Sequence, residues 1–244
     1  MSNFSILNES SLHNTLKKLY AYQTDGKTEV EKYGHIYDII TKDGEIIEIQ
    51  NKNLKQIFPK IKDTLEKGLK IKVVHPVVIT KKIELKDKDG NIIKRSRSSK
   101  KGSVYDVFRE AAGIYQILFE KNFTLEVPEI DITEIRVQEE SLVQSKNNRR
   151  RYKRDWNKIN KKLNEINKIH TFKSPEDYLS LLPASLAEEF CAKDIAKGLK
   201  EEKLCPARIY NNSNLIIWFL KKIQLISETK TENKSHYYKK VIQA

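Results

Sequence analysis

Hydrophobic positions in the first third of the chain follow helical and strand-like periods in turn. Apolar residues recur every three or four positions over residues 10–21 and 54–68, which predicts two amphipathic helices. Between them, residues 28–33 read as a short strand, and residues 36–50 as two strands joined by a tight turn at Asp43-Gly44. This order of helix, strand, hairpin and helix predicts a sheet with helices packed on its faces.

The same alternation continues to residue 137. Residues 69–79 are dense in β-branched side chains and predict a buried strand, with Pro76 near a bend or strand end. A second hairpin turns at Asp89-Gly90, residues 104–119 read as a helix, and residues 123–137 as extended chain. The predicted fold class is therefore α/β (α+β), a mixed sheet flanked by helices.

The last third of the chain has a different pattern. Trp156, Ile159, Leu163 and Ile166 lie at helical spacing among basic residues, which predicts an amphipathic helix over residues 155–169. Ser174 is a predicted N-cap before Pro175, and two further helices and a polar hairpin follow. The expected division is a domain over residues 1–140, a basic helical linker over 141–173, and a second domain over 174–244.

Three polar side chains interrupt the first hairpin. Asp38 breaks an apolar run, and Glu48 and Gln50 flank Ile49 on the second strand, where alternation places both on one face. If the strands pair through their turn, Asp38 lies near that face. The alternative is that these acids are only the solvent-facing side of a half-buried strand.

The residues around this hairpin resemble the PD-(D/E)xK nucleases. The resemblance covers about residues 9–80 and rests on Glu9, Asp38 and the triplet Glu48-Ile49-Gln50. It implies catalytic roles for Asp38, Glu48, Gln50 and Glu9, and a Mg²⁺ (or Mn²⁺) ion held by Asp38, Glu48 and the Ile49 carbonyl. Gln50 stands where these nucleases have a lysine, although some restriction enzymes of the superfamily also have glutamine there.

Other residues bear on this site less directly. Lys17 on the first helix is a candidate for the missing cation, whereas Lys52 could replace it only if the strand continues and its side chain reaches the same face. His13 and His75 have no partner at metal-ligand spacing and are expected to be structural. Beyond the nuclease core, the chain resembles an uncharacterised bacterial family with an EIQ motif, a basic serine-containing stretch (residues 94–111), the run NFTLEV (residues 122–127) and a C-terminal winged helix.

The charge balance points to a polyanionic partner. The net charge is +13, and residues 141–174 carry eleven Lys and Arg against two acids. A Lys-rich proteome would also produce this composition. Residues 174–244 resemble a winged helix-turn-helix domain, in which Ala207 to Asn214 begin the recognition helix and Trp218 packs inside. The expected contacts with double-stranded DNA are Arg149, Arg150, Arg151, Lys153, Arg154, Arg208, Tyr210, Asn211, Asn212, Asn214, Lys230 and Lys234.

Two function classes remain open from the sequence, with a slight preference for the first. One is a DNA endonuclease that hydrolyses phosphodiesters with a bound metal. The other is an inactive nuclease-like core in a DNA-binding or regulatory protein, and RNA processing is a weaker third. Motifs of phosphate-loop, dinucleotide-binding, zincin and serine-hydrolase enzymes are absent. With no bilayer-length apolar run and no signal peptide, a cytoplasmic location is expected, and a homodimer is left open.

Overall fold

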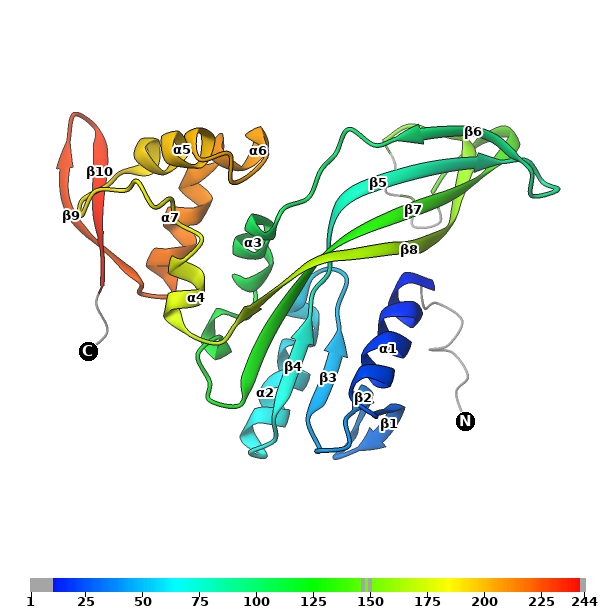
Figure 1. Cartoon of the computed structure of the whole chain (residues 1–244), viewed down its shortest axis with the longest axis horizontal. Helices are drawn as coiled ribbons and strands as arrows, with labels where there is room; N and C mark the ends of the chain where they lie inside the picture. Colours follow the sequence, from blue (N-terminus) through cyan, green and yellow to red (C-terminus); the bar gives the residue numbers. More distant parts are fainter. Residues whose placement is uncertain (1–10, 146–147, 149–150, 242–244) are drawn as a thin grey trace.

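A mixed eight-stranded sheet forms the centre of the molecule (Figure 1). The computed structural model describes residues 11–145, 148 and 151–241. The strand order is β1-β2-β3-β4-β7-β5-β6, with β8 paired to β7. The strands are β1 (Lys27–Lys32), β2 (His35–Ile40), β3 (Ile46–Ile49), β4 (Ile71–Val74), β5 (Val77–Lys86), β6 (Ile92–Arg97), β7 (Phe123–Val143) and β8 (Arg154–Phe172).

Strand β7 organises this sheet because it pairs along both of its edges. One edge pairs in parallel with β4 and then with β5, and the other pairs antiparallel with β8. Strands β4 and β5 are therefore successive pieces along one edge, interrupted at His75 and Pro76. Proline has no backbone N–H to donate, so a break at this point leaves no backbone donor unpaired. The strand expected over residues 69–79 is thus two strands.

The two predicted amphipathic helices cover opposite faces of the sheet. Helix α1 (Ser11–Gln23) buries Leu12 and Leu16 in one cluster with Ile47 and Ile49. Helix α2 (Phe58–Glu66) follows a 3₁₀ turn, η2 (Leu54–Ile57), and packs on the other face. Because side chains alternate along β3, Ile46 joins the α2 cluster while Ile47 joins the α1 cluster. The mixed sheet flanked by helices is as the sequence predicts.

The helix predicted over residues 155–169 is wrong, and with it the helical linker. These residues lie in β8, which pairs with β7 over nearly its whole length. Leu163 and Ile166 are three residues apart yet share one face, since the register shifts between Asp131 and Ile132. A β-bulge adds one residue to a strand and so imitates a helical spacing. Ile159, which the helical stripe would place with the buried residues, is 54% exposed.

The helix predicted over residues 104–119 is divided into shorter pieces. A 3₁₀ turn, η3 (Val104–Asp106), leads into α3 (Val107–Ala111), and a second turn, η4 (Tyr115–Ile117), follows. Gly113 lies between them and packs tightly on Lys55, where an added Cβ would come within 2.9 Å of the Lys55 Cβ. The chain bends at the point where only glycine fits against η2.

The C-terminal segment contains the predicted helices and hairpin. These are α4 (Pro175–Leu179), α5 (Ala192–Glu201), α6 (Ala207–Tyr210), α7 (Ser213–Lys222), β9 (Ile226–Glu232) and β10 (Ser235–Lys240). Ser174 caps α4 through a capping box with Asp177, as predicted. Trp218 was expected inside but is 50% exposed, whereas Phe219 beside it is fully buried. Cys191 and Cys205 are free thiols.

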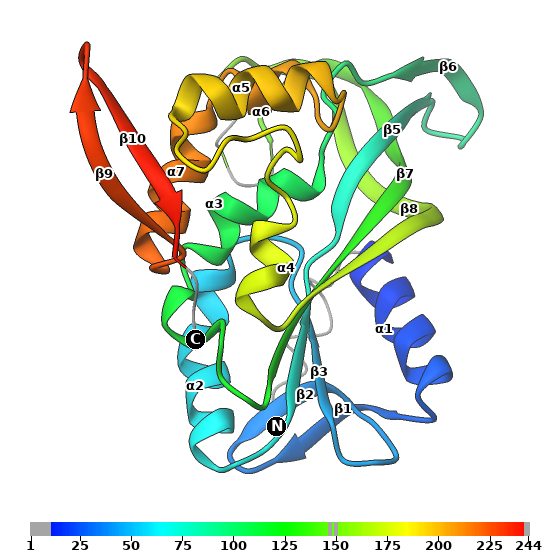
Figure 2. The same cartoon turned by 60° about the vertical axis from the view of Figure 1, so that its left-hand side comes forward.

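One hydrophobic core joins the C-terminal segment to the sheet. Phe219 of α7 contacts Phe108 of α3 with ring centroids 5.4 Å apart, and it contacts Tyr178 of α4 at 5.7 Å. Tyr178 in turn packs on Phe172 at the end of β8. The Tyr105 hydroxyl donates a hydrogen bond to the Leu181 carbonyl oxygen at 2.8 Å. Figure 2 shows α3 between the sheet and the C-terminal helices.

The shared core predicts that the two segments unfold together. Phe219→Ala should cost about 3–5 kcal/mol of unfolding free energy, because it leaves a cavity among Phe108 and Tyr178. Urea unfolding followed separately by far-UV circular dichroism and by tryptophan fluorescence should give one coincident transition, shifted to lower urea. The exposed Ile159→Ala is the control and should change stability by less than about 0.5 kcal/mol. Two separated transitions would contradict the shared core.

Candidate functional site

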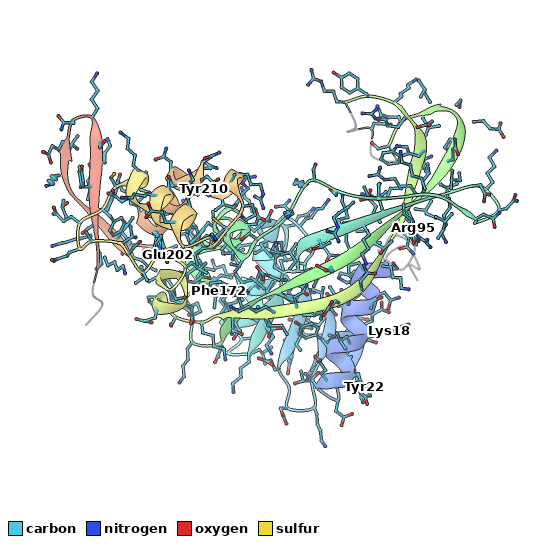
Figure 3. The ribbon with its side chains drawn as sticks, turned by 45° about the horizontal axis from the view of Figure 1, so that its top comes forward. Lys18, Tyr22, Arg95, Phe172, Glu202 and Tyr210 are labelled. Carbon is cyan, nitrogen blue, oxygen red and sulfur yellow. The ribbon has the colours of Figure 1, made fainter. Side chains whose placement is uncertain are left out.

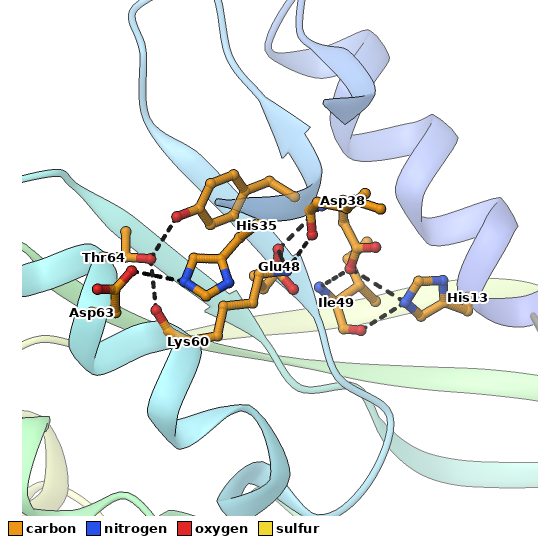
Figure 4. A network of polar contacts seen from close by, with 10 residues as sticks. His13, His35, Asp38, Glu48, Ile49, Lys60, Asp63 and Thr64 are labelled. Atoms are coloured by element: carbon orange, nitrogen blue, oxygen red, sulfur yellow. Dashed lines mark hydrogen bonds and ion pairs between the residues drawn. The ribbon is translucent and has the colours of Figure 1, made fainter. Parts of the chain in front are cut away.

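Asp38 and Glu48 lie where strands β2 and β3 separate (Figure 4). Backbone pairing between these strands covers Ile39 with Ile47 and Ile40 with Ile46. Beyond these pairs, the backbone N–H groups of Asp38 and Ile49 donate to side-chain carboxylates. The Asp38 N–H donates to Glu48 Oε1 at 3.1 Å, and the Ile49 N–H donates to Asp38 Oδ2 at 2.8 Å. Each carboxylate thus bonds to the backbone of the facing strand, and the two side chains go on to contact helices on opposite faces of the sheet, Glu48 toward α2 and Asp38 toward α1.

Glu48 is a buried carboxylate held by a lysine from the opposite helix. Lys60 of α2 donates to Glu48 Oε1 at 2.6 Å and to the Ile36 carbonyl oxygen at 2.5 Å, and its ammonium lies 4.8 Å from the Tyr37 ring centroid. Burial and the nearby charge of Asp38 raise the pKa of Glu48, and the Lys60 charge only partly offsets them. The site therefore contains an acid whose charged form depends on a cation beside it.

Asp38 is held by His13 in the first turn of α1. His13 Nε2 lies 3.3 Å from Asp38 Oδ2 and 2.8 Å from the Ile49 carbonyl oxygen. Because a carbonyl oxygen only accepts, Nε2 carries the proton that is donated here. Burial by itself would raise the pKa of Asp38, but His13 and the Ile49 amide outweigh it and lower that pKa. His13 is thus a partner of the site and not a distant structural histidine.

Gln50 does not extend beside Glu48. Its side-chain amide donates to the Asn53 backbone carbonyl oxygen at 3.3 Å. The backbone carbonyl oxygen of Gln50 accepts from His75 Nδ1 at 2.7 Å. Burial lowers the pKa of His75. These contacts direct the Gln50 amide along the chain, away from the two carboxylates.

The cation that lies at the carboxylates is Lys60, and neither lysine suggested by the sequence takes that place. Lys17 pairs with Glu29 at 2.9 Å. Lys52 lines a separate cleft beyond β3. The positions of Lys60 and His13 at this hairpin could not be predicted from the sequence, because the packing of both helices on the sheet brings them there. No local motif marks either residue.

The predicted DNA-contacting residues occupy three places. Arg151, Lys153 and Arg154 are exposed at the start of β8, and Asn211, Asn212 and Asn214 are exposed around the start of α7. Lys230 pairs with Glu189 and Glu232 on the β9–β10 hairpin, where Lys234 is exposed. Tyr210 is half-buried. Glu9, Arg149 and Arg150 lie outside the described residues.

Arg208, one of the predicted DNA contacts, holds the C-terminal segment to the core. Its Nη1 donates to Asp106 Oδ1 at 2.6 Å, and its Nε donates to the Lys101 carbonyl oxygen at 3.0 Å. Such a bidentate pair fixes the guanidinium in one orientation. Arg208 therefore belongs to the contact between α6 and the η3 turn.

The carboxylate site has the oxygen donors that Mg²⁺ prefers. Within residues 11–145, 148 and 151–241, no three His, Cys, Asp or Glu side chains gather closely enough to hold an ion by themselves. Magnesium, however, commonly binds through one or two carboxylates and keeps several waters. Asp38 Oδ2 and the Ile49 carbonyl oxygen share one partner atom, His13 Nε2, which occupies the point that both oxygens face. The oxygens are of the type that magnesium prefers, and the imidazole would have to turn away for an ion to reach them.

Comparison with known proteins places the chain in a family. A family model described as "Domain of unknown function (DUF8091)" matches residues 10–173. The chain belongs to this family. It is also similar to an uncharacterised protein of Treponema pallidum (strain Nichols), with 28% identity over 189 residues that cover 78% of this chain and 72% of the relative. No solved structure matches it significantly.

The matched family region contains the whole sheet. Residues 10–173 include both helices that cover its faces and every residue contact described above between α1, β2, β3 and α2. Among the described residues, no helix is long and apolar enough to pass through a bilayer.

The Glu48–Lys60 pair gives a prediction for stability. Lys60→Met should destabilise the fold by about 3 kcal/mol, because it leaves the Glu48 carboxylate buried without its cation. The double variant Lys60→Met/Glu48→Gln should recover most of that loss. Chemical denaturation at neutral pH measures both.

Lys62 on the same helix provides the matched control. It is 59% exposed and pairs with exposed Glu66, so Lys62→Met should change stability by less than about 0.5 kcal/mol. Equal losses in the Lys60 and Lys62 variants would show that the buried pair has no special role.

Proposed function

We propose that this protein is a magnesium-dependent DNA endonuclease whose site is formed by Asp38, Glu48 and the Ile49 carbonyl. The observation that carries the proposal is the convergence of Asp38 Oδ2 and the Ile49 carbonyl oxygen on one point, where His13 Nε2 now lies, with Glu48 Oε1 bonded to the Asp38 N–H at 3.1 Å. These are the donors that the resemblance to PD-(D/E)xK nucleases implies. The element order α1, β1, β2, β3, α2, β4 is also the core order of that fold and supports the proposal.

Each residue of the site has a distinct role under this proposal. A bound Mg²⁺ (or Mn²⁺) supplies polarisation of the phosphodiester and lowers the pKa of an attacking water. Asp38, Glu48 and the Ile49 carbonyl hold it. Lys60 supplies the positive charge that Gln50 lacks, and its ammonium already lies 2.6 Å from Glu48, where it can stabilise charge that develops on a phosphate.

Two features of the surface support DNA as the substrate. Arg151, Lys153 and Arg154 are exposed at the start of β8, and the chain has a net charge of +13. The order of α5, α6, α7 and the β9–β10 hairpin is that of a winged helix, in which the hairpin contacts phosphates. Figure 3 locates Tyr210 among the C-terminal helices and Arg95 on the far arm of the sheet.

A second candidate is a DNA-binding protein with an inactive nuclease-like core. The contacts of the carboxylates favour it, since Lys60 and His13 already satisfy Glu48 and Asp38 without a metal. In this case the two ion pairs would only join the helices to the hairpin. DNA binding would then remain, and cleavage would be absent in every metal.

Plasmid cleavage separates the two candidates. With Mg²⁺ or Mn²⁺, the wild-type chain should nick or linearise supercoiled DNA, and Asp38→Asn and Glu48→Gln should each reduce the rate by about 100-fold or more because each removes a charged metal ligand. The matched control is Asp63→Asn, which alters an exposed acid on α2 that pairs with His35 and Lys67. Cleavage that persists unchanged in both site variants would reject the site.

DNA binding by the β8 cations gives a separate prediction. The affinity for a DNA duplex should fall steeply with salt, because lysine and arginine contacts to phosphates release counterions. Replacing Arg151, Lys153 and Arg154 together by glutamine should reduce the slope of log K against log salt by about 2–3. Fluorescence anisotropy over a salt series measures this slope. An unchanged slope would show that these three residues do not contact DNA phosphates.

A further inference from the structure

A basic cleft begins directly beyond the carboxylate site. It encloses about 380 Å³ and starts where β3 and β4 end, at Asn51, Lys52, His75 and Pro76. Its far wall is formed by β5, β7 and β8, and Arg208 of α6 closes one side. In sheets with helices on both faces, ligands commonly bind beyond the carboxyl ends of parallel strands. The cleft therefore lies where this kind of sheet receives ligands.

Positive charge in the cleft exceeds the local acids. Seven Lys and Arg side chains line it against three carboxylates. Asp106 is already paired with Arg208, and Glu110 accepts from the Leu54 N–H at 3.4 Å. The third acid, Glu134, is buried and shared by Arg136, Lys81 and Lys158 at 2.6, 3.4 and 3.8 Å. Asp106 and Glu134 are thus paired with cations, and no ion pair with a described residue involves Lys52, Lys100, Arg109 or Lys161.

Among the cations that line the cleft, Lys161 has a strongly lowered pKa. It lies opposite Glu134 in the register of β7 and β8, yet in the part of the chain that the structure describes it forms no ion pair. Burial, together with the charges of Lys158, Lys52 and Lys81, lowers the pKa of Lys161 to about 8. A group of lysines packed this closely gains stability from an anion that binds among them.

The wall of the cleft also contains an unpaired polar atom. Asn51 Oδ1 is buried and accepts no hydrogen bond from the described residues. Leaving a buried acceptor unpaired is costly, and because a phosphodiester only accepts hydrogen bonds, a water or an N–H or O–H of a bound ligand would complete this oxygen.

We propose that this cleft binds a phosphate group of a nucleic-acid strand, held chiefly by Lys52 and Lys161. The inference rests on the proposed function, because the nucleic-acid strand bound in the cleft is the one that would pass over Asp38 and Glu48. Lys52 is four positions after Glu48 in the chain, which limits the separation of their Cα atoms to about 14 Å. That span corresponds to a few nucleotides.

Helix α1 connects the two sites on the other side. In its first turn, His13 contacts Asp38, and Ser11 donates to the Lys161 carbonyl oxygen at 2.5 Å. The cleft and the carboxylates are therefore held at a defined separation by one rigid element.

Binding without catalysis tests the cleft. In EDTA, anisotropy with a labelled DNA duplex should show that Lys52→Gln and Lys161→Gln each weaken binding by about tenfold, as expected for loss of a hydrogen bond to a charged group. Lys162→Gln is the matched control, with the same charge change at the neighbouring exposed position outside the cleft, and should weaken binding less than about twofold. Equal losses in the Lys161 and Lys162 variants would overturn the proposal. Melting curves confirm folding.

The same assay separates this inference from the nuclease proposal. Asp63→Asn, at a position outside both the cleft and the carboxylate site, should bind DNA normally in EDTA. Loss of binding in the cleft variants supports the phosphate site even if the wild type cuts no DNA. A duplex with 5′-phosphate ends and one with 5′-hydroxyl ends identify the source: an effect of Lys161→Gln on both assigns a backbone phosphodiester, and an effect on the phosphorylated duplex alone assigns a terminal phosphate.

The pH dependence provides a readout that a merely structural lysine would not change. Affinity should decrease as the pH rises through about 8, because Lys161 then loses its proton. Lys161→Arg keeps the charge and should retain the affinity while abolishing this decrease. The other charged groups that line the cleft are Lys52, Lys81, Lys100, Asp106, Arg109, Glu110, Glu134, Lys158 and Arg208. A profile unchanged in Lys161→Arg would contradict the assignment of Lys161.

Discussion

The hydrogen bonding of β7 along both of its edges is the constraint on which the other features depend. Because β4 and β5 follow one another along the same edge, the chain must break between them, and it does so at His75 and Pro76. The His75 N–H still donates to the Glu126 carbonyl oxygen at 2.8 Å, while its side chain holds the Gln50 carbonyl at the end of β3. The end of β3 is thereby fixed beside this break. Both the carboxylate site and the basic cleft originate at that junction.

The buried acids of this basic chain each hold one contact between elements. Glu48 and Lys60 join β3 to α2, Glu134 gathers cations on the arm of the sheet, and Asp106 with Arg208 joins α3's leading turn to α6. A carboxylate used in this way is no longer available to neutralise other cations nearby. A cleft with more lysines than free carboxylates can therefore form without any repeated basic motif in the sequence. The cleft is positively charged because Asp106 and Glu134 are already paired with cations that join neighbouring elements.

The C-terminal segment and the sheet form one packed unit, which bears on how DNA would meet the protein. Phe108, Tyr178 and Phe219 lie in a common core, and the Arg208–Asp106 pair adds a directional contact beside it. Helix α6 of the C-terminal segment and strands β5, β7 and β8 consequently line the cleft from two sides. Figure 1 shows the β9–β10 hairpin at the far end of the C-terminal helices, away from β5 to β8. A nucleic acid bound to the C-terminal helices would therefore have a set direction toward Asp38 and Glu48.

Local patterns determined much of this protein before any tertiary contact is considered. The periods of α1 and α2, the turns at Asp43-Gly44 and Asp89-Gly90, and the cap at Ser174 depend on neighbouring residues, and all appear as predicted. The bond from the Asp38 N–H to Glu48 is local in the same sense, since it lies within the hairpin. Strand β8 was missed because its bulges imitate helical spacing, and a bulge exists only against the partner strand. The tertiary structure alone decided that His13 and Lys60 complete the site and that Lys161 is crowded by other lysines, because these residues come from elements joined only by packing across the sheet.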